Sequence, residues 1–124
     1  MKNFSILVIL FSTILFSKDY RDYYDNGQLK TLGTLENEIG VGKWTLYIEN
    51  GQIKMVGNYK DGNPDGFWRG YFDTGEIHNE GFFKDGKRDG DWFGYYKNGQ
   101  VGLKQKYNDG IIDGKCTRYC RLIN

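Results

Sequence analysis

The segment that decides the fold is Tyr47–Gly70, YIENGQIKMVGNYKDGNPDGFWRG, because the next segment, YFDTGEIHNEGFFKDGKRDGDWFG, repeats its pattern. The same residue types recur every 24 residues: Tyr23, Tyr47, Tyr71, Tyr95 and Tyr119; Gly27, Gly51, Gly75 and Gly99; Gly42, Gly66, Gly90 and Gly114; Trp44, Trp68 and Trp92. A fixed period of this length indicates a repeat array. Four units and the start of a fifth fill residues 18–124, so we expect a single domain without a linker.

Each unit contains a signal for a tight turn. The pairs Asn26-Gly27, Asn50-Gly51, Thr74-Gly75 and Asn98-Gly99 lie between alternating apolar residues. Asn-Gly is the strongest short-range hairpin signal, because both residues accept positive φ. A two-residue loop at Asn50-Gly51 would place Tyr47 opposite Lys54 and Trp44 opposite Gly57. The next hairpins would pair Phe72 with Ile77, Trp68 with Gly81 and Trp92 with Gln105.

A second reversal lies between successive hairpins, at KDGNPDG from Lys60, KDGKRDG from Lys84 and NDGIIDG from Asn108. Asp and Gly at these places suit a longer turn. Two reversals per unit predict eight antiparallel strands. The predicted fold is therefore all-β, an elongated antiparallel meander of stacked β-hairpins in which each unit packs on its neighbours.

Alternation along the strands divides the residues between two faces. We expect Trp68 to cover Gly81 on one face, together with Phe72, Ile77 and Phe83, since an aromatic ring can cover a strand glycine. Tyr47, Tyr71, Tyr95, Lys54 and His78 then lie on the other face, with His78 opposite Tyr71. Tyr is a rigid amphipathic contact residue, so this row is our candidate binding site. The alternative is that each Tyr only supports the sheet through cross-strand pairs.

The first 17 residues differ from the rest. Lys2 is followed by an uncharged apolar run from Phe4 to Phe16 and then by Ser17. A lone cation before a short apolar run predicts a secretory signal peptide, residues 1–17, and export to a periplasmic or extracellular location. A buried first helix and an uncleaved anchor remain alternatives.

Charge and side-chain chemistry exclude several functions. Without residues 1–17 the chain carries 16 basic and 16 acidic residues, interleaved rather than gathered in a basic stripe, so we expect no nucleic-acid partner. No Ser follows residue 17, and no nucleophile has a motif around it, so we expect no enzyme activity and no cofactor.

The Asp and Cys pairs have structural explanations. Pairs such as Asp61 and Asp65 supply too few oxygens for calcium, which needs about six to eight, and suit turns. Cys116 and Cys120 would stand about 13 Å apart on a strand, beyond the roughly 7 Å that a disulfide tolerates, so a bridge requires a turn or helix there. A metal site from these two cysteines and His78 is a weaker alternative.

The pattern YxxNGQ, then Gly, an aromatic residue and KDGxxDGxW resembles the MORN-repeat family in its bacterial variant form. It stands in Tyr47–Trp68 and Tyr71–Trp92, and more loosely in Tyr23–Trp44 and Tyr95–Cys116. The resemblance implies stacked hairpins and a binding role, with protein scaffolds, membrane junctions and phospholipids among the partners of relatives. Some bacterial members are labelled antitoxins of toxin–antitoxin systems.

Two hypotheses about function follow. The first is an exported module that binds a protein partner through its aromatic-rich sheet surface. The second is an envelope ligand binder that recognises cell-wall glycan or lipid headgroups. An antitoxin-like or immunity-like protein is a further alternative.

Overall fold

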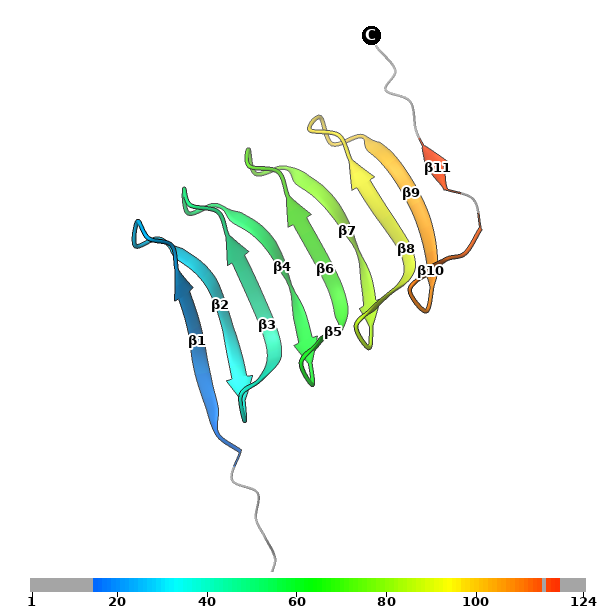
Figure 1. Cartoon of the computed structure of the whole chain (residues 1–124). Helices are drawn as coiled ribbons and strands as arrows, with labels where there is room; N and C mark the ends of the chain where they lie inside the picture. Colours follow the sequence, from blue (N-terminus) through cyan, green and yellow to red (C-terminus); the bar gives the residue numbers. More distant parts are fainter. Residues whose placement is uncertain (1–14, 115, 119–124) are drawn as a thin grey trace, which may run out of the picture.

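The computed structural model describes residues 15–114 and 116–118, which form a single antiparallel sheet (Figure 1). The long strands are β1 (Ser17–Tyr23), β2 (Leu29–Glu36), β3 (Ile39–Tyr47), β4 (Ile53–Lys60), β6 (Gly66–Tyr71), β7 (Ile77–Lys84), β8 (Lys87–Tyr95) and β9 (Val101–Asn108). Three two-residue strands, β5 (Asn63–Pro64), β10 (Ile111–Ile112) and β11 (Thr117–Arg118), pair with β4 or β9. Neighbours in the sheet follow the chain order, which confirms the all-β meander of consecutive hairpins.

The hairpin loops lie where the sequence predicts them, but they are longer than two residues. In the loop at Asn50, the N–H of Gly51 donates to Ile48 O over 2.9 Å, and the N–H of Ile48 donates to Gln52 O over 2.9 Å. Gly51 has a φ of 88°, whereas Asn50 does not have a positive φ. This is the pattern of a type I turn followed by a glycine bulge. The amide oxygen of Asn50 accepts the N–H of Gln52, which holds the Asn in the turn.

The longer loop changes the pairing beside it. Tyr47 pairs with Ile53 rather than Lys54, and the register shifts between Leu46 and Tyr47. Ile77 likewise pairs with Tyr71, so the predicted pairs Phe72–Ile77 and Tyr71–His78 are wrong. Farther from the loops the predicted register holds. Trp44 lies opposite Gly57, Trp68 opposite Gly81 and Trp92 opposite Gln105.

The tight turns are the Asp-Gly pairs, for which the sequence predicted a longer loop. Both residues have positive φ in Asp61-Gly62, Asp85-Gly86 and Asp109-Gly110, as a type I′ turn requires. Lys60 pairs with Asn63 across the first of these turns. Asn37 and Glu38 form the corresponding turn with φ of 49° and 64°, without any glycine. The prediction therefore assigned the short loop to Asn-Gly and the longer loop to Asp-Gly, whereas the structure has the two-residue turn at Asp-Gly and the longer loop at Asn-Gly.

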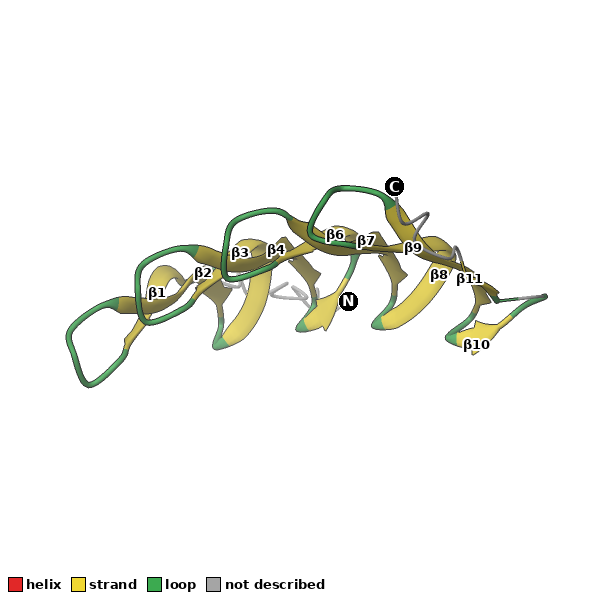
Figure 2. Ribbon diagram, turned by 90° about the horizontal axis from the view of Figure 1, so that it is seen from above, coloured by secondary structure: helices red, strands yellow, loops and turns green. Residues whose placement is uncertain are grey.

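One face of the sheet, the tryptophan face, carries a continuous row of rings. It comprises Tyr20, Trp44, Tyr59, Trp68, Phe83, Trp92 and Tyr107, with neighbouring centroids 5.0–6.5 Å apart. Most of these contacts are edge-on, a favourable geometry for aromatic pairs. The sheet is a single layer (Figure 2), so this row serves as the core. Trp68 and Trp92 are 5% and 7% exposed.

Each Trp covers a glycine of the preceding unit rather than of its own hairpin. A Cβ built at Gly57 would lie 2.0 Å from Cδ2 of Trp68, and one at Gly81 would lie 2.3 Å from Cδ2 of Trp92. The indole N–H of Trp68 also donates to Asn58 O over 3.1 Å. The prediction that Trp68 covers Gly81 is wrong because the ring leans back across the strand pair that joins two units. The tryptophans therefore connect successive hairpins.

Two sequence predictions concern residues that are only partly described. Residues 1–14 of the predicted signal peptide lie outside the described residues, while Ser17 begins β1 and Phe16 O accepts the N–H of Asn37. Cys116 is exposed and Cys120 lies outside the described residues, so the question of a bridge between them stays a prediction.

Candidate binding surface

The face opposite the aromatic row, here called the polar face, is organised around one row of paired residues. Hydrogen-bonded strands align Arg21, Leu32, Thr45, Val56, Arg69, Glu80, Phe93, Lys104 and Thr117. At the middle of this row Nε of Arg69 donates to Glu80 over 2.7 Å. This ion pair, foremost its hydrogen bond, raises the pKa of Arg69.

Tyr95 joins this ion pair. Its hydroxyl donates to the second carboxylate oxygen of Glu80 over 2.6 Å. Burial of the phenol, followed by its hydrogen bond to the carboxylate, raises the pKa of Tyr95 to about 12. Tyr47 and Tyr71 are half-buried, and Tyr71 lies close enough to Arg69 to contribute to the raised pKa of that guanidinium. The Tyr row is thus partly a structural element of the polar face, and its role in binding stays a prediction.

Lys54 and His78 do not join the row in the predicted way. Lys54 is exposed beside the register shift of its hairpin. His78 packs on Phe72, with ring centroids 4.5 Å apart, and its Nδ1 lies 3.2 Å from the amide nitrogen of Asn79. Both residues occupy the extra position created by the bulge near each hairpin loop, which explains why neither lies opposite a Tyr.

The most exposed aromatic contact on the polar face was missed by the sequence argument. Phe67 and Phe82 pair directly across β6 and β7, with centroids 5.2 Å apart, and are 37% and 53% exposed. The guanidinium carbon of Arg69 lies 5.1 Å from the centroid of Phe67. We call these three residues the phenylalanine patch. Aromatic side chains, Phe among them, and Arg are enriched at protein interfaces relative to the rest of the surface.

The repeat itself contains the signal that would have found this patch. The position of Phe67 holds Lys43 and Asp91 in the neighbouring units. The position of Phe82 holds Asn58 and Lys106. A fold that needs only a polar residue at these positions gives no reason for two phenylalanines exposed to solvent, so the departures point to function.

A shallow hollow adjoins the patch. It has a volume of about 220 Å³ and is lined by Lys43, Val56, Gly57, Asn58, Phe67 and Arg69. Lys43 forms no ion pair with any described residue. The hollow therefore offers one uncompensated positive charge beside an exposed ring.

The described residues contain neither a cluster of metal-ligating side chains nor a long apolar helix. Within residues 15–114 and 116–118, no three His, Cys, Asp or Glu side chains come together as a metal site. The same part of the chain contains no helix with the length and hydrophobicity that crossing a bilayer requires.

Fold and surface together define a solenoid-like array of β-hairpins that presents aromatic and charged side chains on an open sheet. A family model described as MORN repeat variant matches residues 18–37, 41–61 and 88–109, just over half of the chain. The chain therefore belongs to the MORN-repeat variant family, whose repeats are typically binding modules for proteins or membrane lipids and are generally non-catalytic. No curated protein and no solved structure matches the chain. Phe67 and Phe82 both lie between the matched segments.

Proposed function

We propose that this chain is an exported, non-catalytic repeat module that binds a protein partner through the polar face, with the phenylalanine patch at the centre of the contact. The observation that carries the proposal is the exposure of Phe67 and Phe82 in a rigid, hydrogen-bonded part of the sheet. Two paired strands hold the backbone that carries these rings, so binding does not have to order a loop, a cost that would reduce the affinity.

The surroundings of the patch indicate the chemistry of the partner. Lys43 lies beside Phe67 and forms no ion pair with any described residue, whereas Lys104, which lies with Phe93 on the other side of the ion pair between Arg69 and Glu80, is already paired with Asp91 over 3.0 Å. A partner that matches this surface has an apolar centre and a carboxylate at its rim beside Lys43, because opposite charges at a rim favour association and orientation. Tyr47, Tyr71 and Tyr95 would extend the contact along the face.

Site-specific photocrosslinking in the cells that make the protein tests this proposal. A benzophenone amino acid at Phe82 should give a protein adduct, and the substitution Phe67→Ser in the same chain should abolish it. Ile111 is a matched control, since it is 73% exposed and lies on β10 at the far end of the array. Absence of an adduct at Phe82, or an equal yield of the same adduct at Ile111, would contradict a protein partner at the patch.

An envelope ligand is the second candidate. It is favoured by the hollow beside Phe67, where an aromatic ring stands next to the amide of Asn58 and the ammonium of Lys43, a composition that suits a sugar ring. Sedimentation with purified cell wall or with liposomes separates the two candidates. Binding to wall or vesicles that Phe82→Ser removes, without a protein adduct, would support this second function. An antitoxin-like or immunity-like role is a variant of the first candidate and would use the same patch.

Export is tested separately. We infer removal of residues 1–17 from the uncharged run after Lys2, so N-terminal sequencing of the mature protein should begin at Lys18. An intact Met1 in a soluble cytoplasmic fraction would refute both export and the predicted location.

A further inference from the structure

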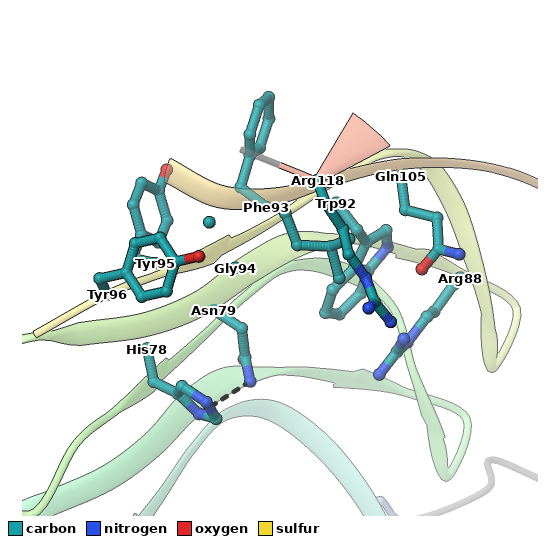
Figure 3. A pocket seen from close by; sticks show the side chains of 12 residues that line it. His78, Asn79, Arg88, Trp92, Phe93, Gly94, Tyr95, Tyr96, Gln105 and Arg118 are labelled. Carbon is teal, nitrogen blue, oxygen red and sulfur yellow. Dashed lines mark hydrogen bonds between the residues drawn. The ribbon is translucent and has the colours of Figure 1, made fainter. Parts of the chain in front are cut away.

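The tryptophan face contains a larger hollow near its C-terminal end. It has a volume of about 480 Å³ and lies over β7, β8 and β9, with Arg118 of β11 at its edge (Figure 3). Trp92, Leu103 and Tyr96 give it apolar walls, and Asn79, Arg88 and Gln105 add polar groups. Its volume is within the range of about 300–1,000 Å³ that small-molecule sites occupy.

Four polar residues of this hollow, Asn79, Arg88, Gln105 and Arg118, differ from the residues at the same repeat position in the other units, whereas His78, which also lines it, stands where two other units have Lys30 and Lys54. Asn79 stands where other units have Thr31, Met55 and Leu103. Arg88 replaces Gly40, Pro64 and Ile112, and Gln105 replaces three glycines. At the position of Arg118 the other units have Asp22, Leu46, Gly70 and Gly94. Four departures from four different strands come together in one hollow, although most other units have apolar or small residues at these positions.

Within the described residues, neither arginine of the hollow has a carboxylate partner. Arg21 and Arg69 each form an ion pair, whereas Arg88 and Arg118 form none with any described residue. The lining of the hollow includes no Asp or Glu. In Figure 3 the guanidinium groups of Arg88 and Arg118 lie in the same part of the hollow, beside Trp92. Two positive charges are therefore gathered in a partly apolar space without compensation.

Arg88 is also held in place. Its guanidinium carbon lies 4.4 Å from the ring centroid of Trp92 and 5.3 Å from that of Tyr107. Its Nη1 donates to the hydroxyl of Tyr107 over 3.0 Å, and that hydroxyl donates to Oε1 of Gln105 over 3.0 Å. A planar guanidinium oriented in this way can present its remaining N–H groups as a fork, which matches a carboxylate or a phosphate.

We propose that this hollow binds an oxyanion, a carboxylate or a phosphate, carried on a small molecule with an apolar ring. Arg88 and Arg118 hold the oxyanion and the ring lies against Trp92 and Leu103. The site is on the face opposite the phenylalanine patch and does not depend on the proposed protein partner.

Titrations followed by ¹H–¹⁵N NMR test the proposal with three probes that share a phenyl ring: phenylacetate, its neutral isostere phenylacetamide, and phenyl phosphate. The two anions should give saturable chemical-shift changes at the Trp92 indole N–H and at the Gly94 amide. The neutral probe should bind at least about tenfold more weakly, since hydrogen bonds to charged groups contribute about 1.5–3 kcal/mol, a factor of ten or more in the dissociation constant. The tighter of the two anions identifies the oxyanion. Equal binding of phenylacetamide, or no saturation with either anion, would overturn the proposal.

Variants locate the binding. Arg88→Gln and Arg118→Gln should each weaken anion binding about tenfold or more, and Arg88→Lys should weaken it as well, because Lys keeps the charge and loses the fork. Arg21→Gln is the matched control and should leave the affinity for both anions unchanged. If Arg88→Gln disturbs the packing on Trp92, Arg118→Gln remains decisive because Arg118 is exposed. Unchanged anion affinity in the Arg118→Gln protein would refute the site.

Discussion

The contact between Trp68 and Gly57 gives the most direct test of how the units are joined. In Gly57→Ala the new methyl carbon would meet Cδ2 of Trp68 at 2.0 Å, whereas ordinary van der Waals contacts begin at 3.4 Å. The indole must therefore move by roughly 1.4 Å, although its N–H is bonded to Asn58 O and the ring makes edge-on contacts with Tyr59 and Phe83. Overpacking of this kind costs about 1–3 kcal/mol.

The change in melting temperature should be easy to measure. In a domain of this size each kcal/mol lowers Tm by about 4–8 °C, so a cost of about 2 kcal/mol corresponds to about 8–16 °C. Trp68→Ala removes a ring that is 5% exposed and should cost about 3 kcal/mol or more. Once the ring is absent, the methyl group introduced by Gly57→Ala meets no clash. The double variant should therefore be about as stable as Trp68→Ala alone, with a coupling of about 2 kcal/mol.

Urea unfolding followed by far-UV circular dichroism provides the free energies for this cycle. The matched control is the cycle of Gly81 with Trp68. Gly81 is the strand partner of Trp68, but a Cβ built there meets Trp92. Coupling should be small with Trp68 and large with Trp92. If Trp68→Ala does not fold, Trp68→Leu serves in the same cycle. A larger coupling of Trp68 with Gly81 than with Gly57 would refute the arrangement in which each Trp covers the preceding unit.

Three further predictions concern single residues. Glu38→Gly should raise Tm by several degrees in thermal melts, because a non-glycine residue at a φ of 64° costs about 1–2 kcal/mol. Gly62→Ala, at a φ of 78°, should lower Tm for the same reason. Tm values equal to that of the unsubstituted protein would contradict this account of the turns. The raised pKa of Tyr95 favours the protonated phenol in the folded state, so the free energy of unfolding should fall as pH rises from about 10 to about 12. Tyr95→Phe should remove this part of the pH dependence. In an ultraviolet titration of the same variant, the tyrosine ionisation at the highest pH should be absent. Tyr71→Ala should cost about 1 kcal/mol or less in urea unfolding, and a loss as large as that of Trp68→Ala would show that the two faces do not share the core as described.

The period of the sequence was sufficient to predict the strands but not the turns between them. Asn-Gly satisfies a two-residue loop, in which both residues have positive φ, and also a three-residue loop, in which only Gly does. The choice depends on the hydrogen bond from the Gln52 N–H to the side chain of Asn50, which residue preference alone does not reveal. The sequence also does not determine which way the Trp68 ring leans, because both neighbouring strands have a glycine beside it, Gly57 on one side and Gly81 on the other.

The candidate site was harder to predict than the fold because repetition misled the choice of residues. Tyr47, Tyr71 and Tyr95 were selected since they recur, but residues that recur in every unit are those that the fold requires. The hydroxyl of Tyr95 is in fact occupied by Glu80. Phe67 and Arg88 are better indicators of binding, because the neighbouring units have other residue types at the same repeat positions and still form the fold.

The same reasoning explains how so small a sheet can carry two sites. Each unit packs on its neighbours alone, so a substitution at a surface position is felt locally and leaves the rest of the array unchanged. The phenylalanine patch lies on β6 and β7 on the polar face, and the hollow around Arg88 and Arg118 lies over β7 to β9 on the tryptophan face. Because the sheet is a single layer with both faces open, the aromatic row must stabilise the fold and line the hollow at once (Figure 2). Trp92 packs in the aromatic row and also lines the hollow. Substitutions at Gly81, which Trp92 covers, should therefore change anion binding. The phenylalanine patch depends only on the pairing of β6 with β7.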